Sequence, residues 1–353
     1  MNAFWPATRR WLARTPLARR IAEGIFRARS RRLLAEFEQQ EPCRSQIGIL
    51  LGLVHRAQRS PFGVQHDFPR IRTIDDFRRL VPLRSAAELN RFPSAPVIPL
   101  ADTARRSAID TALALVARER SRARLFDGSF VLLGDDLTLA DDPSRVLPTL
   151  IQPFANVRGK VRCLIGSADR LCRFLEVCRP DDRVTPLAVL YTPGPSGIVQ
   201  RMRSRLQPTT LVMELGFRPE APITVEDPRQ RAPRLLTSHG VFFEFVLGTE
   251  RFTDSPPRLT LEQVEPGTTY ELVISAPGGW WACRTGAGVQ FLARRSALIR
   301  YVPLMPAAAV PSVRPPVPVT STLPLSHPRT AGIPVERREN SVHIPWSAPA
   351  GRG

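Results

Sequence analysis

The residues most suggestive of chemistry lie at positions 267–291, in the stretch "GTTYELVISAPGGWWACRTGAGVQF". Two apolar runs rich in β-branched residues flank a Gly-Gly turn, and Trp280, Trp281 and Arg284 follow that turn at once. One interpretation is an active-site hairpin with aromatic walls, where an arginine holds an anionic group. The other is a hairpin that packs its tryptophans into a core. The sequence leaves both interpretations open.

Other reactive side chains do not form a recognisable centre. The five cysteines contain no CxxC pair, the five histidines are far apart, and no Ser-His-Asp order stands out. Asp135, Asp136, Asp141 and Asp142 could attract a cation, but they lack the glycine and distal glutamate of a calcium loop, so a solvated turn is favoured. We therefore expect no catalytic residues and no metal site.

The strong positive charge of the chain comes almost entirely from arginine. The formal net charge is +18, and Lys160 is the single lysine. Because arginine takes the place of lysine almost everywhere, a G+C-rich coding bias explains much of this charge. The arginines are also scattered along the chain, so we do not expect nucleic acid as a partner. No window has the roughly 18 uncharged apolar residues of a spanning helix, so no membrane partner is expected. An odd cysteine count without an export signal indicates reduced thiols and a cytoplasmic protein.

The elements that must position these residues indicate an α/β fold. Apolar residues at helical spacing predict a helical segment over 1–59, broken at Pro42. An α/β domain is expected over 60–302, with a β subdomain around 239–293. Thr73 is predicted to cap a helix that begins with Asp75 and Asp76. The Pro-rich segment 303–353 is predicted to be a disordered tail.

Strands and one further helix are predicted between these boundaries. A helix is expected over 103–122 and strands over 128–135, 159–166, 185–191, 208–217, 239–250 and 269–276. Alternation in the last strand predicts that Tyr270, Leu272 and Ile274 are buried on one face.

Three ordered stretches resemble a known family. These are "SPFGVQHDFPRIRTIDDFRRLVPL" at 60–83, "HGVFFEFV" at 239–246 and "VEPGTTYELVISAPGGWWACRTGAGVQF" at 264–291. They resemble signatures of the Gretchen Hagen (auxin-responsive promoter) family of acyl-acid amido synthetases, in the adenylate-forming superfamily. The resemblance implies the large N-terminal domain of an adenylate-forming enzyme, with α/β sheet layers. Family members activate a carboxylic acid with ATP and transfer the acyl group to an amine.

The resemblance also implies where a nucleotide would bind. The family's Ser-Ser-Gly-Thr-Thr phosphate loop has no counterpart between "VPL" and "VIPLAD", and "TPGPSG" at 192–197 is a poor substitute because its prolines lack N–H groups. Glu220 falls near the family's magnesium glutamate. Arg284 and Gly286 are retained in the hairpin, whereas Ala287 replaces the ribose-binding aspartate. Glu220, Arg284 and Gly286 are thus the nucleotide-binding candidates.

The family's C-terminal lid carries a catalytic lysine, and the tail offers no lysine, so we expect a divergent, truncated member without that lid. The leading hypothesis is a catalytically degenerate relative, without a cofactor, kept as a binding or regulatory protein. Its partner would be an active paralogue or another biosynthetic enzyme, and its ligand a small carboxylic acid if a pocket remains. The alternative is an active ligase that uses ATP and magnesium at an unusual site. An arginine-rich binder of nucleic acid or membrane surfaces is a third class.

Overall fold

A mixed sheet of twelve strands organises the protein. The computed structural model describes residues 16–39, 42–91, 98–126, 129–133, 161–177, 186–218 and 220–304. The acidic cluster at 135–142, Lys160 and the segment from 305 onward lie outside these ranges, so the predictions made for them stay untested. Within the described ranges, no helix is long and apolar enough to cross a membrane.

The helices follow the sequence signals closely. They are α2 (Pro16–Gln39), α3 (Pro42–Ala57), α4 (Pro61–Gln65), the 3₁₀ helix η1 (Phe68–Arg70), α5 (Ile74–Leu80), α6 (Ala86–Leu89), α7 (Ile98–Glu119), α8 (Ala168–Val177) and α9 (Ser196–Ser204). Thr73 caps α5 as predicted, because its Oγ1 accepts from the backbone N–H of Asp76 at 3.0 Å. The predicted break at Pro42 is also confirmed, since that proline begins α3.

The strands divide the sheet into a parallel and an antiparallel half. They are β1 (Arg84–Ser85), β2 (Ser129–Leu133), β3 (Val161–Ser167), β4 (Ala188–Thr192), β5 (Leu211–Phe217), β6 (Pro222–Asp227), β7 (Ala232–Leu235), β8 (Phe242–Leu247), β9 (Arg258–Leu259), β10 (Thr269–Ala276), β11 (Trp280–Ala293) and β12 (Leu298–Val302). The spatial order is β2-β3-β4-β5-β6-β7-β12-β11-β10-β8-β9, and β1 pairs with β11. Strands β2 to β5 are parallel, and β5 joins the antiparallel half through β6. Each predicted strand range overlaps one of these strands, and β3 and β4 each end one residue beyond the predicted range.

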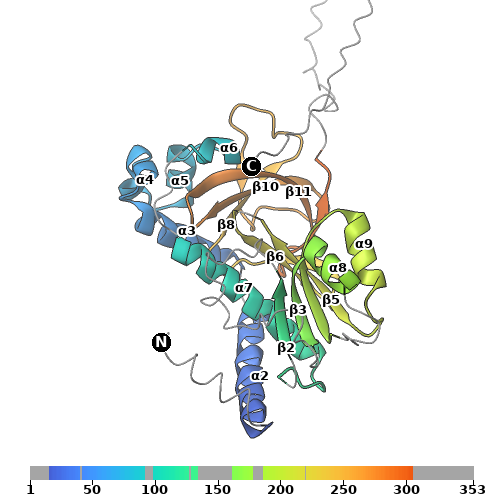
Figure 1. Cartoon of the computed structure of the whole chain (residues 1–353). Helices are drawn as coiled ribbons and strands as arrows, with labels where there is room; N and C mark the ends of the chain where they lie inside the picture. Colours follow the sequence, from blue (N-terminus) through green and yellow to red (C-terminus); the bar gives the residue numbers. More distant parts are fainter. Residues whose placement is uncertain are drawn as a thin grey trace, which may run out of the picture. The chain divides into compact units, whose positions relative to one another are not determined.

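Helices cover both faces of the parallel half (Figure 1). Helices α8 and α9 pack on the face of Val189 and Tyr191, whereas α7 and the second half of α2 pack on the face of Ala188 and Leu190. Successive strand residues point to opposite faces, and here both faces are dry. This layering is an α/β architecture, as the sequence predicted.

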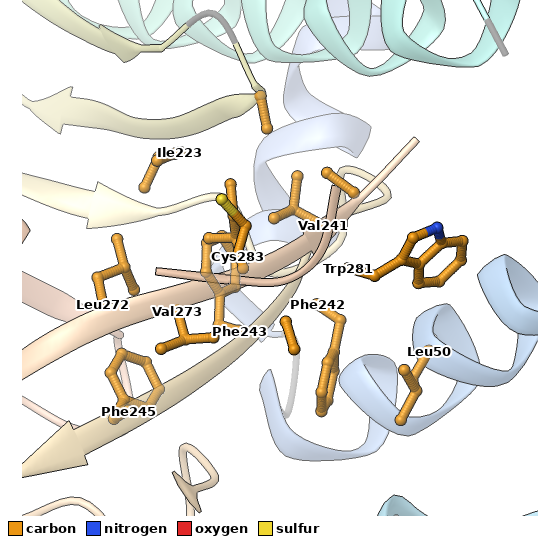
Figure 2. Packing of buried hydrophobic residues seen from close by; sticks show 14 of the residues in the cluster. Leu50, Ile223, Val241, Phe242, Phe243, Phe245, Leu272, Val273, Trp281 and Cys283 are labelled. Atoms are coloured by element: carbon orange, nitrogen blue, oxygen red, sulfur yellow. The ribbon is translucent and has the colours of Figure 1, made fainter. Parts of the chain in front are cut away.

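The antiparallel half holds the largest hydrophobic cluster. Figure 2 shows its side chains from β8, β10 and β11 together with Leu50 of α3. The predicted burial of Tyr270, Leu272 and Ile274 is confirmed, and on the opposite face of β10 Glu271 and Val273 are also buried. Arginines satisfy the carboxylates on that second face, so alternation of residue types conceals the burial.

Candidate functional site

The β10–β11 hairpin uses its glycines for the turn and one tryptophan for the core. Gly278 and Gly279 have φ values of +105° and +93°, which side chains rarely adopt. Trp281 is buried. Its ring stacks on Phe62 at 6.1 Å and meets Phe68 edge-on at 4.7 Å. Trp281 therefore packs in the core, whereas Trp280 is only half-buried. Of the two interpretations of this hairpin, core packing is the one that describes Trp281.

Arg284 is held by groups of this chain. Its Nε donates to Glu271 Oε2 at 3.1 Å, its Nη2 bonds the same oxygen, and Nη2 also donates to the carbonyl of Arg251 at 2.7 Å. The Glu271 side chain is 4% exposed and that of Arg284 30%. A guanidinium with these partners already has its charge matched by an internal carboxylate.

Gly286 sits in a bulge of β11. Its φ is +66°, and the β10–β11 register shifts between the pairs Val273–Arg284 and Glu271–Gly288. The Thr285 hydroxyl donates to the carbonyl of Leu272 at 2.7 Å and accepts from the Ala287 N–H at 3.1 Å. A positive φ is a sufficient backbone reason for glycine at this position.

Glu220 lies on the other side of β11 from Arg284. Arg218 Nη2 donates to the carbonyl of Thr285 at 3.0 Å, and Arg218 Nε is 3.8 Å from Glu220 Oε2. Burial raises the pKa of the Cys283 thiol to about 12, and the nearby charge of Glu220 adds to this effect. Adjacent residues of a strand point to opposite faces, so Glu220 meets the Cys283 face. All three candidate nucleotide-binding residues therefore lie around β11, but Glu220 and Arg284 do not form one cluster.

The segment after "VPL" closes on itself beside this hairpin. Strand β1 pairs in parallel with β11, matching Arg84 with Cys283. Ser85 and Glu88 form a capping box, in which Glu88 Oε2 accepts from the Ser85 N–H at 2.7 Å and from the Ser85 hydroxyl at 2.7 Å. Those hydrogen bonds lower the pKa of Glu88. Residues 85–88 therefore present a carboxylate that their own capping box engages, and residues 92–97 of this segment lie outside the described ranges.

A hollow of about 380 Å³ opens at the carboxyl end of β4. Its lining comes from β4, α9, β5 and the "TPGPSG" turn, namely Tyr191, Pro193, Gly194, Ser196, Val199, Gln200, Arg203 and Glu214. The Tyr191 hydroxyl lies 3.3 Å from both Glu214 Oε2 and Arg203 Nη2. Parallel α/β sheets bind ligands at the carboxyl ends of their strands. We call this hollow the β4–α9 pocket.

The β4–α9 pocket combines one cation with a carboxyl group whose pKa is raised. Burial raises the pKa of Glu214, and the neighbouring charge of Glu226 raises it further. Arg203 is the one cation of the lining residues, and its guanidinium lies 5.9 Å from the Tyr191 ring centroid. The pocket can offer a ligand one guanidinium, the Gln200 amide and the Ser196 hydroxyl. The residues that line this pocket were not predicted from the sequence, because they come from three separate elements. The Gly-Pro turn between β4 and α9 was the single sequence signal for them.

A larger hollow of about 680 Å³ lies away from both regions, against η1 and α5. Two of its three arginines, Arg70 and Arg79, pair with Asp67 at 3.2 Å and Asp76 at 2.8 Å. Two of the three positive charges of this surface are therefore paired with carboxylates of the same elements. Among the residues that the structure describes, no three His, Cys, Asp or Glu side chains converge as metal ligands.

The antiparallel half of the sheet contains a segment that matches a known family. Residues 234–296, which span β7 to the end of β11, match the GH3 family central domain. This part of the chain is similar to the GH3 family. This is the Gretchen Hagen family that the sequence resembles. The matched residues 234–296 of this chain include Arg284 and Gly286.

Two solved structures share the fold of this GH3 relative. A GH3.15 acyl acid amido synthetase in complex with 2,4-DB is similar with a TM-score of 0.53 and 10% identity, over 79% of this chain and 71% of that chain. Another GH3.15 acyl acid amido synthetase structure has a TM-score of 0.51 and 10% identity, over 77% and 69%. No curated protein matched. At this identity the likeness shows the fold alone, which the chain shares with these two acyl acid amido synthetase structures.

Proposed function

We propose that this GH3 relative is catalytically degenerate and works as a binding or regulatory protein. Its partner in this proposal is an active paralogue or another biosynthetic enzyme, in the cytoplasm. The observation that carries the proposal is the internal pairing of Arg284 with Glu271. A nucleotide that needed this guanidinium would first have to break a largely buried ion pair, which is costly.

Two further features support the same conclusion. Ala287 stands where the resemblance expects a ribose-binding aspartate, and alanine cannot accept a hydrogen bond from a hydroxyl. Ser85, in the segment where the phosphate loop would follow, exchanges its hydrogen bonds with Glu88. Ala287 thus lacks one nucleotide contact that the resemblance implies, and the Ser85 hydroxyl is already engaged within the chain.

The ligand that we propose is a small carboxylic acid in the β4–α9 pocket. Arg203 lies at the rim of that pocket and supplies the charge that a carboxylate needs. Burial raises the pKa of Glu214, which disfavours the charged form of this carboxyl next to an anion.

The alternative function is an active ligase with an unusual nucleotide site. The position of the β4–α9 pocket favours this alternative, because the carboxyl ends of parallel strands are also where α/β enzymes hold nucleotides. The two functions differ in the ligand that stabilises the folded chain, since a ligand that binds only the native state raises the unfolding midpoint.

Thermal unfolding with each ligand tests the proposal. A panel of small carboxylic acids should raise the unfolding midpoint, and Mg-ATP should leave it unchanged. Arg203→Met should abolish the response to the acid, whereas Arg201→Met, an exposed arginine of the same helix outside the pocket lining, should retain it. A midpoint raised by several degrees with Mg-ATP would support the ligase instead.

A further inference from the structure

Helix α2 carries an apolar stripe that the other residues described by the structure leave uncovered. Leu17, Ile21 and Ile25 are 67%, 49% and 65% exposed. They are four residues apart, so they lie one above the other on a single side of the helix. The opposite side packs on the body of the protein through buried Leu34 and Phe37. Figure 1 shows the first turns of α2 standing clear of the sheet. Helix α2 therefore has two apolar sides, of which the described part of the chain covers one.

Arginines border the uncovered stripe. Helical rotation places exposed Arg20 and Arg31 along one edge of the stripe and exposed Arg29 along the other. Arg29 is partly neutralised, because its Nη2 is 3.1 Å from Asp110 of α7. Arg32 follows at the end of the stripe and pairs with Glu36 at 3.2 Å.

The acidic residue nearest the stripe points inward. Glu23 is the only acid between positions 16 and 35. Its carboxylate accepts from the N–H groups of Leu125 at 3.1 Å and Phe126 at 2.9 Å, and it pairs with Arg27 at 2.8 Å. The outer side of the first five turns of α2 thus combines apolar and cationic residues and carries no carboxylate.

We propose that the outer face of α2 binds the surface of an anionic lipid bilayer. Leu17, Ile21 and Ile25 enter the boundary between headgroups and acyl chains, while Arg20 and Arg31 contact lipid phosphates. A helix with this pattern lies in the plane of the membrane interface and does not span it. The inference is independent of the acid-binding function, and it gives a location to the third class of function that the sequence left open.

A second copy of the chain is a poorer occupant of this face. If two α2 helices paired through their stripes, the bordering arginines of one copy would lie beside those of the other. Guanidinium groups that lie side by side repel one another, which would destabilise such a dimer. An anionic bilayer supplies both a nonpolar layer and the opposite charge, so it matches both features of the face.

Co-sedimentation with vesicles tests the proposal on the full chain. The protein should sediment with vesicles of equal parts phosphatidylcholine and phosphatidylserine, and only weakly with phosphatidylcholine alone. The double variant Ile21→Ser, Ile25→Ser should bind the anionic vesicles at least about fivefold more weakly. Val64→Ser is the matched control, because Val64 is 69% exposed on a different helix, and it should bind like the unmodified chain.

A second variant separates charge from insertion. Arg20→Gln with Arg31→Gln keeps the apolar stripe, so it should bind anionic vesicles more weakly and with less dependence on salt. Unfolding midpoints close to that of the unmodified chain would show that each variant folds, since the changed side chains are exposed. Three results would overturn the proposal: no sedimentation with anionic vesicles, unchanged binding of the Ile21→Ser, Ile25→Ser variant, or a dimer in solution that this variant dissociates.

Discussion

Arg284 of β11 and Glu271 of β10 form an ion pair across the hairpin, with Arg284 Nε 3.1 Å from Glu271 Oε2. The arginine is one of the few residues of the "GGWWACRTGA" stretch that the resemblance to the amido synthetases retains, and its charge is matched inside the chain. Its position is kept, and its role in this structure is to hold two strands together.

Glu271→Gln should therefore destabilise the fold. The change removes the anion from a carboxylate site that is 4% exposed and leaves Arg284 without its charge partner. Because Arg284 is itself partly exposed, the loss should be about 2–3 kcal/mol rather than that of a fully buried pair. Urea unfolding measures it, and Glu262→Gln, at an exposed position, is the control. A loss no larger than that of the control would contradict the structural role given to Arg284.

Gly286→Ala tests why this glycine is present. A Cβ at Gly286 would meet no atom within 4 Å, but the φ of +66° is strained for alanine. The substitution should cost about 1 kcal/mol of unfolding free energy. Gly24→Ala in the middle of α2 also has free space around it and should instead stabilise by about 0.5–1 kcal/mol. If Gly286→Ala proved neutral, the bulge geometry would not be the reason for the glycine.

His239 should make the fold sensitive to acid. The ring is buried, and its Nε2 lies 2.9 Å from the Thr111 hydroxyl, which itself donates to the Ser107 carbonyl. Burial lowers the pKa of His239 from 6.5 to about 4. The unfolded chain then binds the proton more tightly, so stability is full above pH 6.5 and falls as the pH drops toward 4. Since one pKa unit is about 1.4 kcal/mol, the loss should approach about 3 kcal/mol.

Unfolding free energies measured from about pH 7.5 to about pH 4, a range that includes the ordinary histidine pKa of 6.5 and the folded-state value of about 4, give this slope. In His239→Gln the part of the slope due to this ring should disappear. An identical pH dependence in the two proteins would show that His239 does not titrate as its burial requires.

Glu244 should be essential to the second face of the antiparallel sheet. The side chain is 1% exposed and pairs with Arg78 of α5 at 3.0 Å and Arg258 of β9 at 3.5 Å. Glu244→Gln leaves two arginines with a neutral neighbour, and the expected cost is about 3–5 kcal/mol. Glu36→Gln, which breaks the exposed pair with Arg32, should cost no more than about 0.5 kcal/mol. Similar costs for both variants would mean that Glu244 is not the anchor of α5.

The local elements were predictable because their signals lie close together in the chain. The capping box of Thr73 and Asp76 needs only three residues of spacing. The break between α2 and α3 depends on a single residue, Pro42. The hairpin was visible because glycines separate two runs of β-forming residues. Each of these signals acts over a few residues, and no distant partner decides its outcome.

The pairings that define the candidate site were not predictable, because they depend on strand register and on separate elements. Nothing in the order of residues indicates that Glu271 meets Arg284 across a bulged hairpin. The Tyr191, Arg203 and Glu214 side chains come from β4, α9 and β5, and only the folded sheet brings them together. Burial of Glu271 and Glu244 was also hidden, since a carboxylate in a strand normally indicates a solvent-facing side.

ATP–pyrophosphate exchange is the most direct test of the central claim, that this relative of the acyl acid amido synthetases has kept their fold and lost their adenylating chemistry. Purified full-length chain should be incubated with Mg-ATP, labelled pyrophosphate and a panel of carboxylic acids. We predict no label in ATP above that of a reaction without protein, for every acid. Exchange that depends on one of the acids, and that Arg284→Met abolishes, would contradict the claim and identify a working ligase.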